Sequence, residues 1–143
     1  HWFEDTAGAN FPMGQGVFSF YKEDDGGGNW GYLQKEFFPI DALGFGNQGF
    51  EHNYHFTMHL SGSFVFQHGQ FVTFSGNDDA WLFIDGELAM DLGGLHAPVE
   101  HTVPLDGMAL NGGDIHTFDL FYAQRQSEDS SFGLETNIDC FFE

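Results

Sequence analysis

Short runs of apolar and aromatic residues, separated by glycine turns, recur along the whole chain. No segment shows the sustained 3.6-residue periodicity with capping residues that is typical of a helix. The 143 residues include 20 glycines and 19 phenylalanines; aromatic residues favour strands, and glycines mark the turns between them. The pattern therefore predicts an all-β fold, an antiparallel β-sandwich or flattened β-barrel, with residues 1–143 forming a single domain.

The strongest local signal is an Asp-Gly pair between two apolar runs, Trp81–Ile84 and Leu88–Met90. A two-residue hairpin turn of type I′ needs positive φ at both central residues, which the pair Asp85–Gly86 tolerates. We therefore expect two antiparallel strands here. We expect a second hairpin around Gln67–Gln70, and a central strand at Thr117–Ala123, which is apolar on both faces.

Further expectations concern the two ends of the chain. Val17–Tyr21 has the composition of a strand, and the acidic and glycine-rich run Glu23–Gly28 is typical of a solvated loop. Near the C-terminus, Phe132–Phe142 alternates so that Cys140 falls on the apolar face. We expect a packed core thiol at this position rather than a nucleophile.

Acidic residues dominate the charged side chains. Three Lys and Arg residues stand against 22 Asp and Glu residues, a formal net charge of −19. Such a surface repels phosphate backbones and anionic lipids, and no apolar run approaches the roughly 20 residues of a membrane span, so we expect no nucleic acid and no membrane insertion. One cysteine cannot form an internal disulfide. Because the chain opens at His1 without an initiator methionine, we expect a domain excised from a larger secreted or surface protein.

Two adjacent carboxylates, Asp78 and Asp79, precede the first strand of the predicted hairpin. Neighbouring carboxylates repel each other, so both stay ionised only when a cation or several hydrogen-bond donors lie between them. Calcium is the first candidate because it prefers oxygen ligands. A solvated turn is a common alternative role for paired aspartates before a strand. The two residues by themselves leave both interpretations open.

Three histidines within His52–Leu60 could suggest a zinc site. If this segment is a strand, only His55 and His59 share its polar face, roughly 13 Å apart at the usual strand rise. This separation does not suit two ligands of one zinc ion. We therefore expect a half-buried strand whose polar histidines point outward.

Five segments follow one another along about the last three quarters of the chain: Phe37-Phe38-Pro39-Ile40-Asp41, HNYHF from His52, GNDDAWLFIDGELAMDLGGLH from Gly76, LFYAQR from Leu120 and FGLETNI from Phe132. Together they resemble the fibro-slime branch of the protective-antigen-like (PA-fourteen) domain family. The resemblance implies a β-sandwich of the kind found in secreted and surface proteins, including bacterial toxins, glycosidases, adhesins and yeast flocculins.

The resemblance also implies a binding site. In lectin members of the family, two adjacent aspartates joined by a cis peptide bond bind calcium, and the calcium binds sugar hydroxyls. Asp78 and Asp79 match that pair, and Gln124 matches a position where relatives usually carry glutamate; these three are the implied metal ligands. Asn77 stands where many relatives have a third aspartate, so we expect modest calcium affinity. The implied sugar-binding residues are Asp78, Asp79, Gly94, His96, Gln124, Gln126, Asp129 and Ser130.

Two of the neighbouring residues have alternative roles. Asp91 is expected to hydrogen-bond a tight loop beside the site. His96 could contact sugar or brace the same loop.

These observations lead to one expected function. We expect a calcium-dependent carbohydrate-binding module, the lectin part of a cell-surface adhesin, that binds vicinal hydroxyls of terminal sugars on extracellular glycans or polysaccharides. Such a module would be a monomeric domain, not an enzyme, and would act in cell adhesion or biofilm formation. The alternative is a calcium-stabilised structural or protein-docking module without sugar binding. A glycosidase needs two carboxylates roughly 5 Å or more apart across a cleft, and no such pair is signalled.

Overall fold

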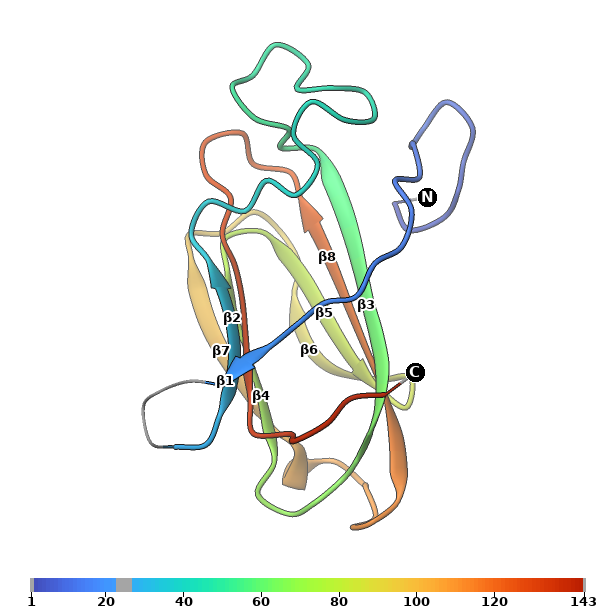
Figure 1. Ribbon diagram of the computed structural model, residues 1–143, viewed down its shortest axis with the longest axis vertical. Helices are drawn as coiled ribbons and strands as arrows, with labels where there is room; N and C mark the ends of the chain where they lie inside the picture. Colours follow the sequence, from blue (N-terminus) through green and yellow to red (C-terminus); the bar gives the residue numbers. More distant parts are fainter. Residues whose placement is uncertain (1, 23–26, 143) are drawn as a thin grey trace.

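The computed structural model describes residues 2–22 and 27–142. Two antiparallel sheets lie face to face as a sandwich (Figure 1), which confirms the expected all-β fold. The strands are β1 Tyr21–Lys22, β2 Trp30–Gln34, β3 Phe56–Val65, β4 Phe71–Gly76, β5 Asp79–Ile84, β6 Glu87–Leu92, β7 Val99–Pro104, β8 Ile115–Gln124 and β9 Phe132–Thr136. A 3₁₀ helix, η1 Leu105–Gly107, follows β7. Over the described ranges, no helix is long and apolar enough to cross a membrane.

The five-stranded sheet has the order β1-β2-β9-β4-β7, and the four-stranded sheet has the order β3-β8-β5-β6. β8 lies between β3 and β5 and pairs with both, which confirms the expected central strand. The β5–β6 hairpin is also confirmed: Asp85 and Gly86 have φ values of 51° and 76°, the two positive angles that its tight turn requires.

An aromatic core fills the space between the sheets. Phe132 of β9 lies at its centre, with ring centroids 5.0 Å from Phe37, 5.2 Å from Tyr122 and 5.8 Å from Phe74. All four side chains are buried. Because burying one such side chain contributes about 1.5–3 kcal/mol, this cluster is a main source of the sandwich's stability.

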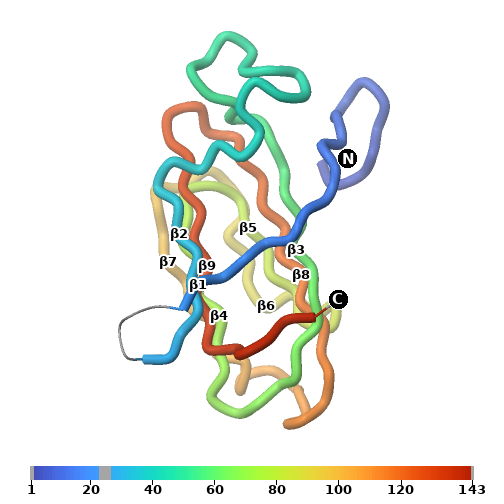
Figure 2. Tube along the Cα trace, in the orientation of Figure 1, coloured from blue at the N-terminus to red at the C-terminus, as the bar shows by residue number. Residues whose placement is uncertain are grey.

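The N-terminal segment crosses from the four-stranded sheet to the five-stranded sheet before it enters β1 (Figures 1 and 2). Phe18 packs 4.4 Å from Tyr32, and Phe20 stacks 5.8 Å from Phe141. The expected strand at Val17–Tyr21 is wrong, because only Tyr21 of this segment enters a strand. Side-chain packing, rather than a hydrogen-bonded ladder, attaches the segment to the sandwich.

The expected hairpin around Gln67–Gln70 is also wrong. β3 pairs with β8, whereas β4 pairs with β7 and β9, so the turn carries the chain from one sheet to the other. Phe64 and Phe74 lie on opposite sides of this turn and are both fully buried. Burial of both aromatic side chains in the shared core therefore takes the place of direct pairing between the two strands.

Two further expectations meet different outcomes. β9 ends at Thr136, so the alternation does not continue, and Cys140 is exposed rather than packed in the core. His55 and His59 are exposed, as expected, but β3 begins at Phe56, so His55 precedes the strand; His59 Nε2 lies 2.8 Å from an Asp119 oxygen. The expected loop Glu23–Gly28 lies largely outside the described residues.

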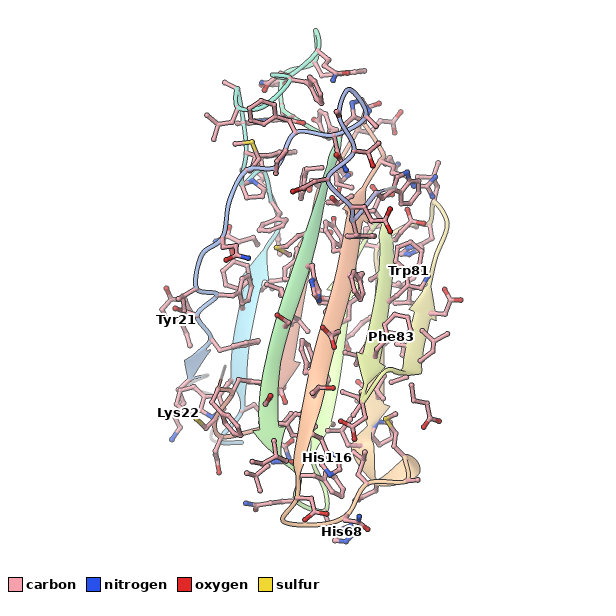
Figure 3. All side chains as sticks on the ribbon, turned by 90° about the vertical axis from the view of Figure 1, so that its right-hand side faces the viewer. Tyr21, Lys22, His68, Trp81, Phe83 and His116 are labelled. Atoms are coloured by element: carbon pink, nitrogen blue, oxygen red, sulfur yellow. The ribbon has the colours of Figure 1, made fainter. Side chains whose placement is uncertain are left out.

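A buried histidine lies at the end of the sandwich farther from Trp81 (Figure 3). His116 Nδ1 is 2.7 Å from Asp85 Oδ2, and the Thr117 N–H donates to the other oxygen of Asp85 at 2.8 Å. The hydrogen bond that His116 donates to Asp85 outweighs burial and raises the pKa of His116. The bonds from His116 and Thr117 lower the pKa of Asp85. The pair therefore fixes the β5–β6 turn most strongly when both groups are charged.

We expect the Gly76→Ala substitution to lower the free energy of unfolding by about 1–3 kcal/mol, as overpacking does. An added Cβ would lie 2.6 Å from Phe74 Cζ and 3.0 Å from the Ser131 carbonyl oxygen. Gly107→Ala is the matched control, because its Cβ would meet nothing within 4 Å. Urea unfolding measures both; equal stability of the two variants would contradict the packing at Gly76.

We expect the stabilisation from the His116–Asp85 pair to be largest between about pH 4 and pH 6.5. The raised pKa of His116 means that its contribution is present below about pH 6.5 and is lost as pH rises through the folded pKa. The lowered pKa of Asp85 means that its contribution is present above about pH 4 and is lost as pH falls through the folded pKa.

Urea unfolding of the parent chain and His116→Gln at pH 5.5 and pH 8.5 measures this effect. The destabilisation should shrink by up to about 1 kcal/mol at the higher pH, since Asp85 is partly exposed. His101→Gln, at an exposed position, is the control. A destabilisation that does not change with pH would exclude the charged pair.

Candidate cation and ligand site

Three adjacent strands of the four-stranded sheet, β8, β5 and β6, have ends that lie side by side at one end of the sheet. β8 ends at Gln124, β6 ends at Leu92, and β5 begins at Asp79. Because neighbouring strands are antiparallel, the start of β5 lies beside the ends of β6 and β8. The aspartate pair and the loops that follow β6 and β8 therefore lie together at this end.

Both aspartates are buried at this end of the sheet. Asp78 is 0% exposed and Asp79 is 2% exposed. Asp78 Oδ2 accepts hydrogen bonds from the backbone N–H groups of Arg125 and Gln126, at 3.0 and 2.8 Å. Asp78 Oδ1 is buried and has no hydrogen-bond partner among the described residues. One oxygen of the pair is thus left without the compensation that a buried carboxylate needs.

Arg125 supplies the positive charge beside Asp79. Its Nε and Nη2 atoms donate to the two carboxylate oxygens at 2.6 and 2.8 Å, and the Gly94 N–H donates to Asp79 Oδ1 at 2.5 Å. Burial raises the pKa of Asp79, but these hydrogen bonds outweigh burial and hold the pKa below its usual range. Asp79 in turn raises the pKa of the Arg125 guanidinium. The aspartate is therefore ionised and fully paired at neutral pH.

The N-terminal segment covers the other side of Arg125. The Arg125 guanidinium carbon lies 4.9 Å from the centroid of the Trp2 ring, a cation–π contact. The Thr57 hydroxyl donates to the Trp2 carbonyl at 2.9 Å, and Phe3 packs 5.0 Å from Phe121. These contacts attach the segment to β3 and β8, so the tryptophan is held where the guanidinium can pack against it.

The loop after β8 is held by buried amide side chains. Gln124 Nε2 donates to the Gln126 and Asp129 carbonyl oxygens at 2.9 and 2.8 Å, and its Oε1 accepts from the Tyr122 hydroxyl at 2.5 Å. Asn77 Nδ2 donates to the Asp129 carbonyl at 2.9 Å. An aspartate at position 77 could not donate this bond when ionised. The two amides therefore fix the loop.

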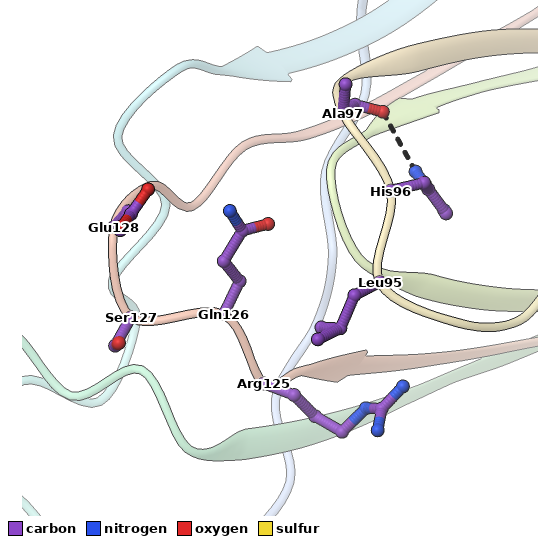
Figure 4. Close-up of a pocket in the computed structure, with 7 residues that line it drawn as sticks. All are labelled: Leu95, His96, Ala97, Arg125, Gln126, Ser127 and Glu128. Atoms are coloured by element: carbon purple, nitrogen blue, oxygen red, sulfur yellow. Dashed lines mark hydrogen bonds between the residues drawn. The ribbon is translucent and has the colours of Figure 1, made fainter.

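An open pocket of about 460 Å³ lies between the two loops (Figure 4). Its lining consists of Leu95, His96 and Ala97 from the β6–β7 loop and Arg125, Gln126, Ser127 and Glu128 from the β8–β9 loop. Arg125 lines the pocket and also bonds Asp79, whereas neither aspartate lines it. Arg125 is therefore the pocket residue whose side chain contacts the acidic pair.

The structure brings some of the predicted sugar-binding residues together and separates others. His96 and Gln126 line the pocket. Gly94 contacts Asp79 through its backbone, and Asp129 is exposed on the same loop as Gln126. Ser130 is buried, with its hydroxyl donating to the Phe37 carbonyl at 2.6 Å, so it braces the loop instead of lining the pocket.

Asp91 and His96 both brace the loop that follows β6. Asp91 Oδ1 accepts from the Gly93 N–H at 2.9 Å, as expected of a residue that holds the loop. The two ring nitrogens of His96 lie 3.0 and 3.2 Å from the carbonyl oxygens of Ala97 and Leu92. His96 thus braces its loop while it also lines the pocket.

The oxygen atoms at Asp78 and Asp79 are ligand atoms of the type that hard cations prefer. Asp78 Oδ1 is a buried carboxylate oxygen without a partner in the part of the chain that the structure describes, and Gln124 Oε1 keeps one lone pair after it accepts from Tyr122. No group of three or more His, Cys, Asp or Glu side chains over 2–22 and 27–142 is arranged to hold a metal ion. A cation here therefore depends on amide, backbone or ligand oxygens in addition to the two carboxylates.

The peptide bond between the aspartates differs from the one that the resemblance implies. Every peptide bond over the described ranges is trans, including that between Asp78 and Asp79. The two side chains nevertheless converge on one residue, because Asp78 accepts from the Arg125 backbone and Asp79 accepts from its guanidinium.

Sequence reasoning missed the role of Arg125, the contact of Trp2 with its guanidinium and the bracing role of Asn77. Arg125 is the single arginine of the chain and directly follows Gln124. In a chain of net charge −19, one arginine next to a predicted metal ligand is a signal that could have drawn attention to it.

Comparison with known proteins gives a consistent family match. A model of the PA14 domain matches residues 47–139. Protein psiC and protein psiD of Dictyostelium discoideum are 35% and 34% identical over 145 residues, which is 96% of this chain and 28% of each relative. Protein psiQ of the same organism is 30% identical over 151 residues, 96% of this chain and 15% of that protein. The chain thus spans about a quarter or less of these relatives. No solved structure gives a significant match.

We expect Asp79→Asn to lower the free energy of unfolding by about 1–3 kcal/mol in the presence of chelator, because it removes the charge that Arg125 and the Gly94 N–H compensate. Urea unfolding at pH 7 provides the measurement. The exposed Asp139→Asn removes the same charge away from the site and should change stability by less than about 0.5 kcal/mol. Equal effects of the two substitutions would contradict a buried ion pair at Asp79.

Proposed function

The chain belongs to the PA14 domain family, which includes carbohydrate-binding modules, and from this membership we propose that it is a calcium-dependent carbohydrate-binding module of a cell-surface protein. The observation that carries the proposal is the buried aspartate pair beside an open polar pocket. Asp79 bonds Arg125, and Arg125 lines the pocket together with Gln126, Ser127 and Glu128. This combination suits a ligand that is rich in hydroxyl groups.

The pocket residues offer the donors and acceptors that sugar hydroxyls need. Gln126 supplies an amide, Glu128 a carboxylate, and Arg125 the guanidinium donors that Asp79 leaves free. Leu95 and Ala97 add apolar surface for the C–H face of a sugar ring. Shallow sites that combine a few polar groups with apolar surface fix a ligand's orientation.

Calcium is the proposed cofactor. Asp78, Asp79 and the amide oxygen of Gln124 would hold it, together with backbone carbonyls. When bound, calcium supplies open coordination positions that two vicinal hydroxyls fill. The chain's own residues hold the loops in place: Asn77 and Gln124 fix the β8–β9 loop, and Asp91 fixes the turn after β6.

The proposal includes weak binding by each copy and no catalysis. An open pocket buries only part of a ligand, so a single site binds weakly and adhesion depends on many copies. The chain matches only part of its relatives, which suits a module carried by a larger protein. Extracellular placement, where calcium is abundant, is part of the same proposal.

We expect a multivalent form of the intact chain to bind particular glycans on an array in millimolar calcium and to lose that binding in chelator. The reason is that the sugar hydroxyls would bind to a calcium ion that both carboxylates hold. Gln126→Ala should weaken glycan binding at least tenfold by removing a pocket amide, while calcium affinity stays unchanged. Asp139→Asn is the control.

A silent array, together with a melting temperature that calcium still raises, would contradict sugar binding and would favour a calcium-stabilised structural or protein-docking module. Glycan binding that persists in chelator would keep the carbohydrate-binding function and remove the role of calcium.

A further inference from the structure

We propose that Arg125 is a built-in competitor of the divalent cation: its guanidinium occupies Asp79 in the metal-free protein and leaves when the cation binds. The inference rests on the proposed function, because it concerns the same acidic pair. It goes beyond that function by assigning the residue that sets the affinity of the site and keeps the metal-free site folded.

The first observation is the geometry of the ion pair. Arg125 donates to both oxygens of Asp79, at 2.6 and 2.8 Å, and a third donor, the Gly94 N–H, also contacts Oδ1. A bidentate guanidinium fills the same oxygens that a cation would need. The carboxylate therefore cannot serve both partners fully at once.

The second observation is the charge balance at the pair. Asp78 and Asp79 carry two negative charges, and Arg125 is the single arginine of the chain, so the metal-free site retains one uncompensated negative charge. Asp78 Oδ1 is fully buried and has no hydrogen-bond partner among the residues that the structure describes, so the uncompensated charge lies on this carboxylate. A divalent cation neutralises the pair completely, which Arg125 cannot do.

The third observation shows how the guanidinium can leave. Arg125 is partly exposed, with 38% of its side-chain surface accessible, and it lines the open pocket. The Trp2 ring lies 4.9 Å from the guanidinium. The arginine can thus turn into the pocket without any change in the core. Released there, its donors would face the ligand.

Competition between the two cations has a direct consequence for affinity. Any ion that replaces Arg125 must first break a bidentate, charge-assisted pair, so the apparent calcium affinity is lower than the carboxylates alone would give. The arginine also protects the metal-free state, since it prevents the buried Asp79 carboxylate from lying without a charge partner. The loops around the site are therefore formed before the ion arrives.

The test uses calcium alone as the probe, without any glycan. Isothermal titration of the intact chain should show an affinity increase of about tenfold or more for Arg125→Gln, and a smaller increase for Arg125→Lys, which keeps the charge but lacks the bidentate fork. Lys35→Gln removes one positive charge at an exposed position outside the pocket and should change the affinity by less than about threefold.

A second readout follows the arginine itself. Because the chain has one arginine, a uniformly ¹⁵N-labelled sample gives one arginine Nε–H signal, and that signal belongs to Arg125. Calcium should shift or broaden this signal, and chelator should restore it. In Trp2→Leu the metal-free signal should already be displaced, because the ring that packs on the guanidinium is gone.

The outcomes separate this inference from the proposed function. Calcium that binds the parent chain and Arg125→Gln with equal affinity, or that leaves the Nε–H signal unmoved while it binds, overturns the competitor role and leaves the proposed function standing. An absence of calcium binding in the parent chain and in Arg125→Gln overturns the cation site in both. Tighter binding by Arg125→Gln together with a calcium-dependent Nε–H shift supports the competition.

Discussion

Two carboxylates buried side by side require compensation from every direction, and this requirement shapes one whole end of the sandwich. Asp78 takes backbone N–H groups from the β8–β9 loop, and Asp79 takes the Gly94 N–H and the Arg125 guanidinium. Leaving either group unpaired costs several kcal/mol, which is comparable to the net stability of a small domain. The two loops are consequently fixed by the same charges that would bind a ligand.

The amides around the pair show why the site tolerates the absence of further acids. Asn77 and Gln124 both use their NH₂ groups to hold the Asp129 carbonyl, a bond that ionised aspartate or glutamate could not donate. Each amide in place of a carboxylate also removes one charge that the single arginine could not balance. Rigidity of the loop and a low local charge therefore come from the same two residues.

Local chemistry made part of this structure predictable. Asp85–Gly86 fixes a hairpin through its own φ preferences, and Thr117–Ala123, which is apolar on both faces, indicates a central strand. The Gln67–Gln70 turn also lies between two strand-forming runs, yet its strands enter different sheets, because the deciding contacts lie in the distant core. The expected core position of Cys140 is wrong because alternation in the sequence does not show where β9 ends.

The residues of the site also divide into those that local sequence predicts and those that depend on distant contacts. The aspartate pair was predictable because its chemistry lies within two adjacent residues, and the pairing of Asp79 with Arg125 was not, because 46 positions separate them. Ser130 lies in a polar run with Asp129, but two hydrogen bonds with the Phe37 backbone hold it inward. Outside the site, the acidic groups are mostly solvated, so their repulsion is screened, while their combined field still concentrates cations around the molecule. The acidic surface and the buried pair therefore favour the same kind of ion, the first by attraction at a distance and the second by direct contact.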